Sequence, residues 1–118
     1  MAQKRPAITN ETRNTSLARE AVLADNAWTR LRGLLGRPRL QEGQAMVIRP
    51  STGIHTFFMG YPIDVVYMDS AGRVARCLER LRPFRFGPID LRTKAVIELP
   101  AGAIARSRTQ EGDQIALT

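Results

Sequence analysis

From Gly43 onward the chain consists of short apolar runs separated by turn-forming residues, a pattern that excludes most helical folds. The runs are rich in Val, Ile, Phe and Tyr, which is typical of strands. The predicted strands are Gln44–Ile48, Ile54–Phe58, Ile63–Asp69, Arg73–Leu78, Lys94–Leu99 and Gln114–Leu117. We therefore predict a mainly β fold: a small antiparallel β-sandwich or barrel with one or two short helices.

Two short helices and one earlier strand are expected around this pattern. Apolar residues recur at helical spacing from Trp28 to Leu35, and the Gly36 and Pro38 that follow are typical of a helix end. The alanine-rich segment Pro100–Arg106 favours one or two helical turns, and Leu17–Ala24 predicts a first strand. One strand is ambiguous, because the apolar residues of 74–81 also match a helical stripe.

The length of 118 residues fits one domain, which we place at residues 17–118. Residues 1–16 are polar and lack periodicity, and we expect them to form a flexible N-terminal tail. Hydrophobic residues make up 43% of the chain and charged residues 25%. That balance is ordinary for a soluble globular protein, and it excludes a disordered acidic tail and a membrane bundle.

The net charge of +7 is distributed in blocks. Residues 1–40 and 71–94 each carry +5, whereas residues 41–70 carry −2 and residues 95–118 carry −1. All but two of the 18 basic residues are arginine, which binds carboxylates and phosphates with a planar fork. The basic blocks therefore suggest an anionic partner, and nonspecific binding of nucleic acid through the two arginine-rich segments is one alternative function. A GC-rich genome that encodes surface positions as arginine would give the same pattern.

Cysteine usage and the first residues bear on the compartment. Cys77 is the single cysteine, so no disulfide can form within the chain. No apolar segment of signal-peptide length follows the first basic residues, and no stretch is long enough to span a membrane as a helix. We therefore expect a soluble, cytoplasmic protein. An upstream signal, if one precedes this sequence, would instead indicate association with the cell envelope.

Four blocks of the sequence together carry a family resemblance. They are residues 28–37 (WTRLRGLLGR), 54–59 (IHTFFM), 62–66 (PIDVV) and 96–102 (VIELPAG), and a Gly-Asp pair follows at 112–113. In this order the blocks resemble the bacterial and archaeal family called domain of unknown function 192, over residues 17 to 118. The resemblance implies a compact β-barrel or sandwich with one or two short helices, and it favours a strand for Arg73–Leu78.

The same resemblance limits what can be said of function. Members of the family have no established activity, so no catalytic residue is implied. Many members carry an export signal or a membrane anchor, a pattern from which this sequence departs. The residues of the family's characteristic block are His55, Thr56, Phe58, Met59, Pro62 and Asp64.

The sharpest constellation of functional side chains is a predicted pair of His55 and Asp64. If residues 59–62 form a hairpin loop, Ile54–Phe58 pairs with Ile63–Asp69 and these two side chains become diagonal neighbours on one face. A carboxylate beside an imidazole fixes its tautomer and raises its pKa, as in general-base pairs.

Three interpretations of this pair stay open. It can be a purely structural pair, or part of a pocket for an anionic small molecule or peptide that also includes Tyr61 and Thr56. It can also be the acid and base of a hydrolase or lyase. We lean towards a binding or accessory module over an enzyme. With one His and one Cys in the chain, no spacing motif supports a metal site, and no cofactor is predicted.

Two further features have competing interpretations. Residues 80–86 (RLRPFRF) interleave arginines with aromatics, which is the composition of single-stranded nucleic-acid contacts. Alternatively, the segment is a connection whose Phe84 and Phe86 plug the edge of the sandwich. Cys77 can be an activated thiolate, or a small residue of the core among its apolar neighbours.

Overall fold

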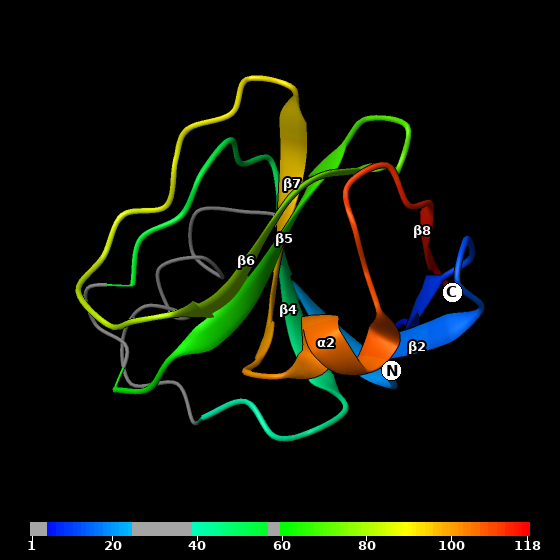
Figure 1. The fold of residues 1–118 in the computed structure, drawn as a ribbon, viewed down its shortest axis with the longest axis horizontal. Coiled ribbons are helices and arrows are strands. Elements are labelled where there is room, and N and C mark those ends of the chain that lie inside the picture. Colours follow the sequence, from blue (N-terminus) through cyan, green and yellow to red (C-terminus); the bar gives the residue numbers. More distant parts are fainter. Residues whose placement is uncertain (1–4, 25–38, 57–59) are drawn as a thin grey trace.

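The computed structural model describes residues 5–24, 39–56 and 60–118 (Figure 1). Within them the chain is mainly β, with two sheets and one short helix, as the sequence predicts. The elements are β1 (Ile8–Asn10), β2 (Thr15–Ala18), β3 (Glu20–Ala24), β4 (Gln44–Ile48), β5 (Ile63–Asp69), β6 (Val74–Leu81), β7 (Thr93–Pro100), α2 (Ala103–Ser107) and β8 (Ile115–Leu117).

The larger sheet has five strands in the order β3-β4-β7-β5-β6. The interior strand β5 pairs with β6 on one side and β7 on the other, and six of its seven residues are buried. This burial explains why the run is apolar without alternation. The pairs are antiparallel except that of β3 with β4, which is parallel.

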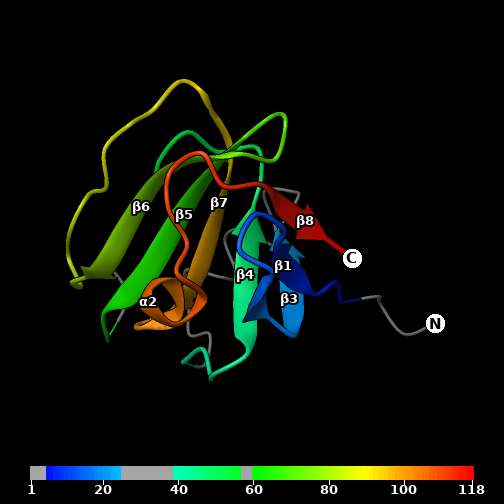
Figure 2. The same cartoon turned by 45° about the vertical axis from the view of Figure 1, so that its right-hand side comes forward.

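The smaller sheet has three antiparallel strands in the order β2-β1-β8, and it lies beside the large sheet on the side away from β6 (Figure 2). Ile8, Leu17 and Ile115 of this sheet share one buried cluster with Val47 and Ile97 of the large sheet. The main core therefore lies between the two sheets, in a sandwich-like arrangement that does not close into a barrel.

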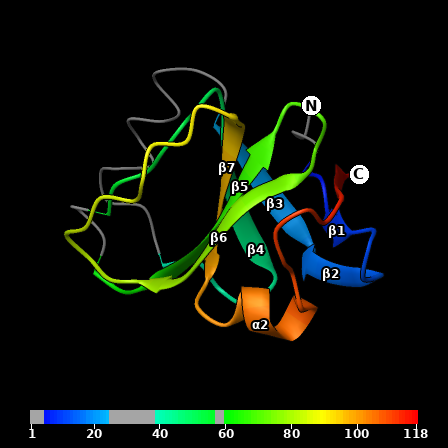
Figure 3. The same ribbon diagram turned by 45° about the horizontal axis from the view of Figure 1, so that its top comes forward.

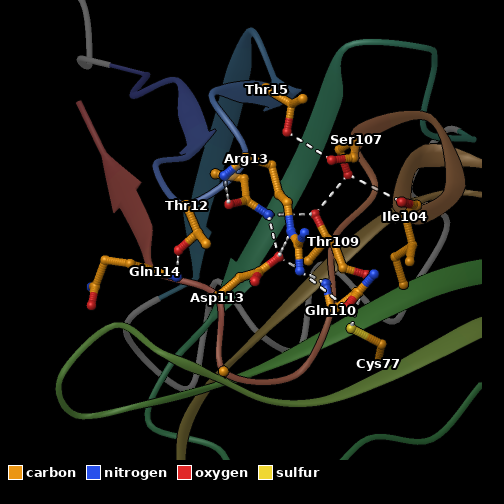
Figure 4. A network of polar contacts seen from close by, with 12 residues as sticks. Thr12, Arg13, Thr15, Cys77, Ile104, Ser107, Thr109, Gln110, Asp113 and Gln114 are labelled. Atoms are coloured by element: carbon orange, nitrogen blue, oxygen red, sulfur yellow. Dashed lines mark hydrogen bonds and ion pairs between the residues drawn. The ribbon is translucent and has the colours of Figure 1, made fainter.

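A buried polar network ties the small sheet to the segment around α2 (Figure 4). Asn10 donates hydrogen bonds to Thr109 and to the Asp113 carboxylate, at 3.0 and 2.9 Å. Arg13 and the backbone N–H of Gln110 also donate to Asp113. These contacts satisfy the polar groups of the network, and they fix the two ends of the folded chain to each other.

The N-terminal expectations need correction. Residues 8–16 are not a flexible tail, because β1 lies in the small sheet with Ile8 and Asn10 fully buried. The predicted strand Leu17–Ala24 is two strands, and the chain passes from one sheet to the other at Arg19, whose N–H donates to the Gly43 carbonyl. The polar composition of residues 8–16 reflects buried hydrogen bonding and turns, which periodicity does not detect.

Strand β6 explains the ambiguous apolar stripe of residues 74–81. Its pairing with β5 shifts register twice, between the partners of Tyr67 and Met68 and between those of Ile63 and Val65. Each bulge adds a residue, so Val74 and Cys77 face the main core while Leu78 faces the opposite side. A bulged strand therefore reproduces a spacing that resembles a helix.

The helix predicted near the C-terminus is confirmed as α2, which packs against the large sheet beside β2 (Figure 3). It begins after Gly102, whose φ of +99° favours glycine. The helix predicted from Trp28 to Leu35 lies outside the described residues. In the described part of the chain, no helix has the length and hydropathy needed to cross a membrane.

Candidate ligand-binding groove

Two connecting segments line an open groove of about 470 Å³. One segment follows β4, and the other joins β6 to β7. The lining residues are Pro50, Ser51, Thr52, Gly53, Ile54, His55, Phe86, Gly87 and Ile89. The groove therefore lies over the second apolar cluster of the protein, which includes Val65 and Tyr67.

Backbone hydrogen bonds hold the two segments together as an irregular ribbon. The N–H of Gly87 donates to the Ile54 carbonyl, and the N–H of Asp90 donates to the Thr52 carbonyl, each at 2.8 Å. His55 and Phe86 form an isolated antiparallel bridge between them. The walls of the groove are therefore built from backbone pairing, which leaves side chains along both walls available to face a ligand.

Gly87 and Tyr67 fix this ribbon to the sheet. The Tyr67 hydroxyl donates to the Pro88 carbonyl at 2.6 Å. A Cβ atom on Gly87 would lie 2.6 Å from that hydroxyl and 2.8 Å from Cγ2 of Ile54. Only glycine lets the backbone approach the sheet this closely, so the position of the groove depends on residue 87.

Asp90 fixes the far end of the same segment. Arg92 donates to both of its carboxylate oxygens, at 3.0 and 2.7 Å, and Arg76 lies 3.7 Å from one of them. The hydrogen bond from Arg92 lowers the pKa of Asp90 to about 2, against the opposing effect of burial. Asp90 is therefore ionised over the physiological range, and its charge is balanced by arginines.

The structure separates the four residues that the sequence predicts for the site. His55 lines the groove. Thr56 lies behind it, fully buried, and its hydroxyl donates to the Arg82 carbonyl at 2.6 Å. The Tyr61 hydroxyl accepts from the N–H of Leu40, so Tyr61 lies outside the groove. Among these four residues, His55 is the one that the groove includes.

The predicted pair of His55 and Asp64 is wrong. The hairpin that would bring them together does not form, because β6 and β7 occupy both edges of β5. Asp64 points to the face of the sheet that carries α2, where its carboxylate accepts from the N–H groups of Arg80, Gly102 and Ile104. Asp64 has no exposed surface, and its carboxylate is occupied by these three backbone donors.

The segment between β6 and β7 also differs from expectation. Phe84 and Phe86 do not plug the edge of the sandwich, because their exposed fractions are 67% and 73%. Ile89 and Leu91 are exposed to 76% and 81%. The exposure of Ile89 and Leu91 was not predicted. The one local signal is that apolar and polar side chains alternate between Pro88 and Arg92.

Cys77 is a half-buried residue beside the main core. Burial, followed by the nearby carboxylates of Glu111 and Asp113, raises the pKa of its thiol to about 12. The thiol is therefore protonated near neutral pH, and the activated-thiolate interpretation is wrong. The described residues contain no group of three or more His, Cys, Asp or Glu side chains arranged to hold a metal ion.

The fold defines a small, mainly β domain with an irregular groove over its large sheet. Residues 8–117 match the family model DUF192, described as "Uncharacterized ACR". The chain therefore belongs to the domain of unknown function 192 family, as its sequence blocks predict.

Relatives with similar sequences are archaeal. The chain is 32% identical over 112 residues to a UPF0127 protein of Thermococcus sibiricus, and the alignment covers 92% of this chain and 72% of the relative. It is 34% identical over 111 residues to a UPF0127 protein of Pyrococcus horikoshii, with 92% and 96% covered. A crystal structure of a Novosphingobium aromaticivorans protein of unknown function is similar in fold, with a TM-score of 0.78 at 21% identity, covering 94% and 83% of the two chains.

Proposed function

We propose that this protein is a binding module whose groove receives an anionic ligand, either a small molecule or an acidic peptide. The observation that carries the proposal is the charge at the groove. None of the lining residues is acidic, and the segment that contributes Phe86, Gly87 and Ile89 to the lining also carries the exposed arginines Arg82 and Arg85, which lie outside the lining. An anion in the groove would therefore meet no carboxylate of the lining, and the positive charge of this segment would attract it.

The single nearby carboxylate in this ribbon does not weaken that field. Asp90 is occupied by Arg92 and Arg76. Neither Arg82 nor Arg85 forms an ion pair with an acidic side chain in the part of the chain that the structure describes. Their guanidinium groups can therefore bind a carboxylate or phosphate without first breaking an internal ion pair.

His55 supplies an imidazole to the lining of the groove, a ring whose nitrogens can form hydrogen bonds with a polar ligand group. The apolar part of the lining, which includes Ile54, Phe86 and Ile89, would contact the uncharged part of a ligand. The arrangement therefore fits a ligand with one anionic end and one apolar end.

A thermal-unfolding screen tests the proposal. The probes are inorganic phosphate, citrate, adenosine monophosphate and a series of monocarboxylates of increasing chain length. A ligand that binds the folded state at a concentration a hundredfold above its Kd stabilises it by about 2.7 kcal/mol, which raises the Tm by several degrees. We expect such a rise for an anion with an apolar part.

Two variants assign any rise in the Tm to the groove. His55→Gln removes the imidazole from the lining, and Arg85→Glu reverses one charge at the rim. Arg5→Glu changes the net charge as much as Arg85→Glu does, but Arg5 lies 4.0 Å from Glu20 of β3, at the other edge of the sheet. The proposal is contradicted if no probe raises the Tm, or if Arg5→Glu reduces the rise as much as Arg85→Glu.

A further inference from the structure

Residues 82–91 expose an unusual amount of apolar surface. The large hydrophobic side chains that are exposed in the described part of the chain all lie here: Phe84, Phe86, Ile89 and Leu91. Each is at least two-thirds exposed. A concentration of exposed apolar side chains on one short segment marks an interaction site more often than chance exposure.

This segment is held in place and displays its side chains from a fixed backbone. Gly87 packs against Tyr67, and the N–H of Phe84 donates to the Thr56 carbonyl at 2.9 Å. Phe84 also has a φ of +60°, a conformation that is costly for a bulky residue. The structure therefore maintains an unfavourable backbone conformation at a position whose side chain points to solvent.

Two exposed arginines are interleaved with these side chains. Arg82 and Arg85 lie within the same segment, whose one acidic residue, Asp90, is already engaged by Arg92. Protein–protein interfaces are enriched in aromatic residues and arginine and depleted in lysine. Residues 82–91 match this composition, because they contain two phenylalanines and two arginines and no lysine. The surface is therefore both apolar and positively charged.

We propose that residues 82–91 form a docking surface for an acidic polypeptide segment of a partner protein, whose apolar side chains pack on Phe84, Phe86, Ile89 and Leu91. Carboxylates of the partner pair with Arg82 and Arg85. The surface adjoins the groove, since Phe86 and Ile89 belong to both. Phe84 and Leu91 do not line the groove, so docking can be tested separately from the binding of a small anion.

The composition of the surface favours a polypeptide over other partners. Single-stranded nucleic acid stacks on rings, but Ile89 and Leu91 offer none. The groove beside the docking surface can accommodate a side chain that protrudes from a polypeptide. A flat lipid surface has no such protruding group. In a symmetric dimer built on this patch, the arginines of one copy would approach the same arginines of the other, which is unfavourable.

A peptide-display experiment tests the proposal with the full chain immobilised. Random dodecapeptides are selected for binding, and enriched peptides are synthesised and titrated by fluorescence anisotropy. We expect enriched sequences that combine at least two large apolar residues with a net negative charge. The double variant F84S/L91S should weaken their binding by about tenfold or more, as is typical of interface anchors.

Charge and groove variants complete the design. R82E/R85E should weaken the same peptides about tenfold and reduce their salt dependence, whereas Arg5→Glu should leave both unchanged. The two proposals are separated by F84S/L91S, which should leave the rise in Tm with a small anion unchanged, because Phe84 and Leu91 do not line the groove. His55→Gln should reduce that rise. All these positions except His55 are exposed, so the thermal midpoints of the variants check that folding is retained.

Several outcomes would overturn the docking surface. One is that no peptide is enriched, and another is that the enriched peptides are basic or are bound equally by F84S/L91S. Oligothymidylate, or vesicles of phosphatidylcholine and phosphatidylglycerol, could bind more tightly than the peptides do. If that binding required Phe84 and Leu91, the surface would be assigned to nucleic acid or to membranes, respectively. Self-association that F84S/L91S abolishes would assign it to a second copy of the chain.

Discussion

The carboxylate of Asp64 accepts a hydrogen bond from the backbone N–H of Ile104, 40 positions further along the chain, at 2.9 Å. The same side chain accepts from Gly102, at the start of α2, and from Arg80, at a bulge of β6. One buried carboxylate therefore joins the interior strand β5 to the edge strand β6 and to the helix α2. The Asp64 carboxylate takes the place of an N-cap side chain, since the N-cap residue of α2 is Gly102, which has no side chain to accept these hydrogen bonds.

Asp64→Ala should destabilise the protein by about 3 kcal/mol or more, because it leaves several partly buried N–H donors without an acceptor. Asp64→Asn keeps one acceptor oxygen and should cost less than the alanine variant. Urea unfolding measures both changes as a lower midpoint at an unchanged slope. Glu79→Gln, at an exposed carboxylate of β6, is the matched control and should shift the stability by less than about 0.5 kcal/mol. An Asp64→Ala midpoint equal to that of the control would contradict the structural role.

The strands that the sequence predicts best are those whose burial is simple. Gln44–Ile48 and Ile63–Asp69 have the predicted bounds, because each is a short apolar run between strong turn signals. Gly72, with a φ of +80°, ends the second run in a tight turn. The family blocks also predict the fold correctly. Local pattern and turn chemistry therefore suffice for the elements, but they do not determine which elements pair.

The candidate site was less predictable, because it depends on pairing between distant segments. Ile54–Phe58 and Ile63–Asp69 are adjacent in sequence and separated by a Gly and a Pro, so a hairpin is the natural expectation. In the structure His55 instead pairs with Phe86, which lies 31 positions away. Nothing in the local pattern near His55 indicates that partner. The exposure of Phe84 and Leu91 is likewise not indicated by the local pattern of apolar residues.

Stability should fall with acid in a range that Asp90 helps to define. Its pKa is about 2 in the folded protein, against 3.8 as the ordinary value. Between these values the unfolded chain binds the proton and the folded protein does not, so the free energy of unfolding decreases as the pH falls from about 4 to about 2. Above that range the contribution of the Asp90–Arg92 pair is fully present.

Asp90→Asn tests this assignment. The variant should be less stable than the wild type at pH 6, and the difference should shrink between pH 4 and pH 2. Urea midpoints over this pH range give the comparison. Asp69→Asn, at a turn carboxylate for which no basic partner is present in the described residues, serves as the control. A constant difference between Asp90→Asn and the wild type at all pH values would contradict the lowered pKa.

The Cys77 thiol should be unreactive in the folded protein. Burial raises its pKa to about 12, so the thiolate fraction at pH 8 is far smaller than in an unfolded chain. We expect Ellman's reagent to react at least about tenfold more slowly with the native protein than with protein in urea. Glutathione at the same pH calibrates the effect of urea on the reagent itself. Equal rates in the two states would show that the thiol is accessible and ionisable in the fold.

Gly87 should be the least replaceable residue of the groove wall. Gly87→Ala places a Cβ within 2.6 Å of the Tyr67 hydroxyl and 2.8 Å of Ile54, so we expect overpacking to cost about 1–3 kcal/mol. Gly60→Ala, where no atom lies within 4 Å of the added Cβ, should change stability by less than about 0.5 kcal/mol. Tyr67→Phe removes the hydroxyl and its hydrogen bond to Pro88, which costs about 0.5–1.5 kcal/mol by itself.

In the double variant, the cost of Gly87→Ala should be smaller than in the wild-type background, because one of the two close contacts is gone. The contact with Ile54 remains, so part of the cost should persist. A double-mutant cycle measured by urea unfolding therefore predicts a coupling free energy of at least about 0.5 kcal/mol between Tyr67 and Gly87. If the free-energy changes of Gly87→Ala and Tyr67→Phe were strictly additive, the segment around Gly87 would be able to move away from the sheet at no cost in free energy. In that case the groove would not be held at a fixed position, and its binding of a ligand would require ordering first.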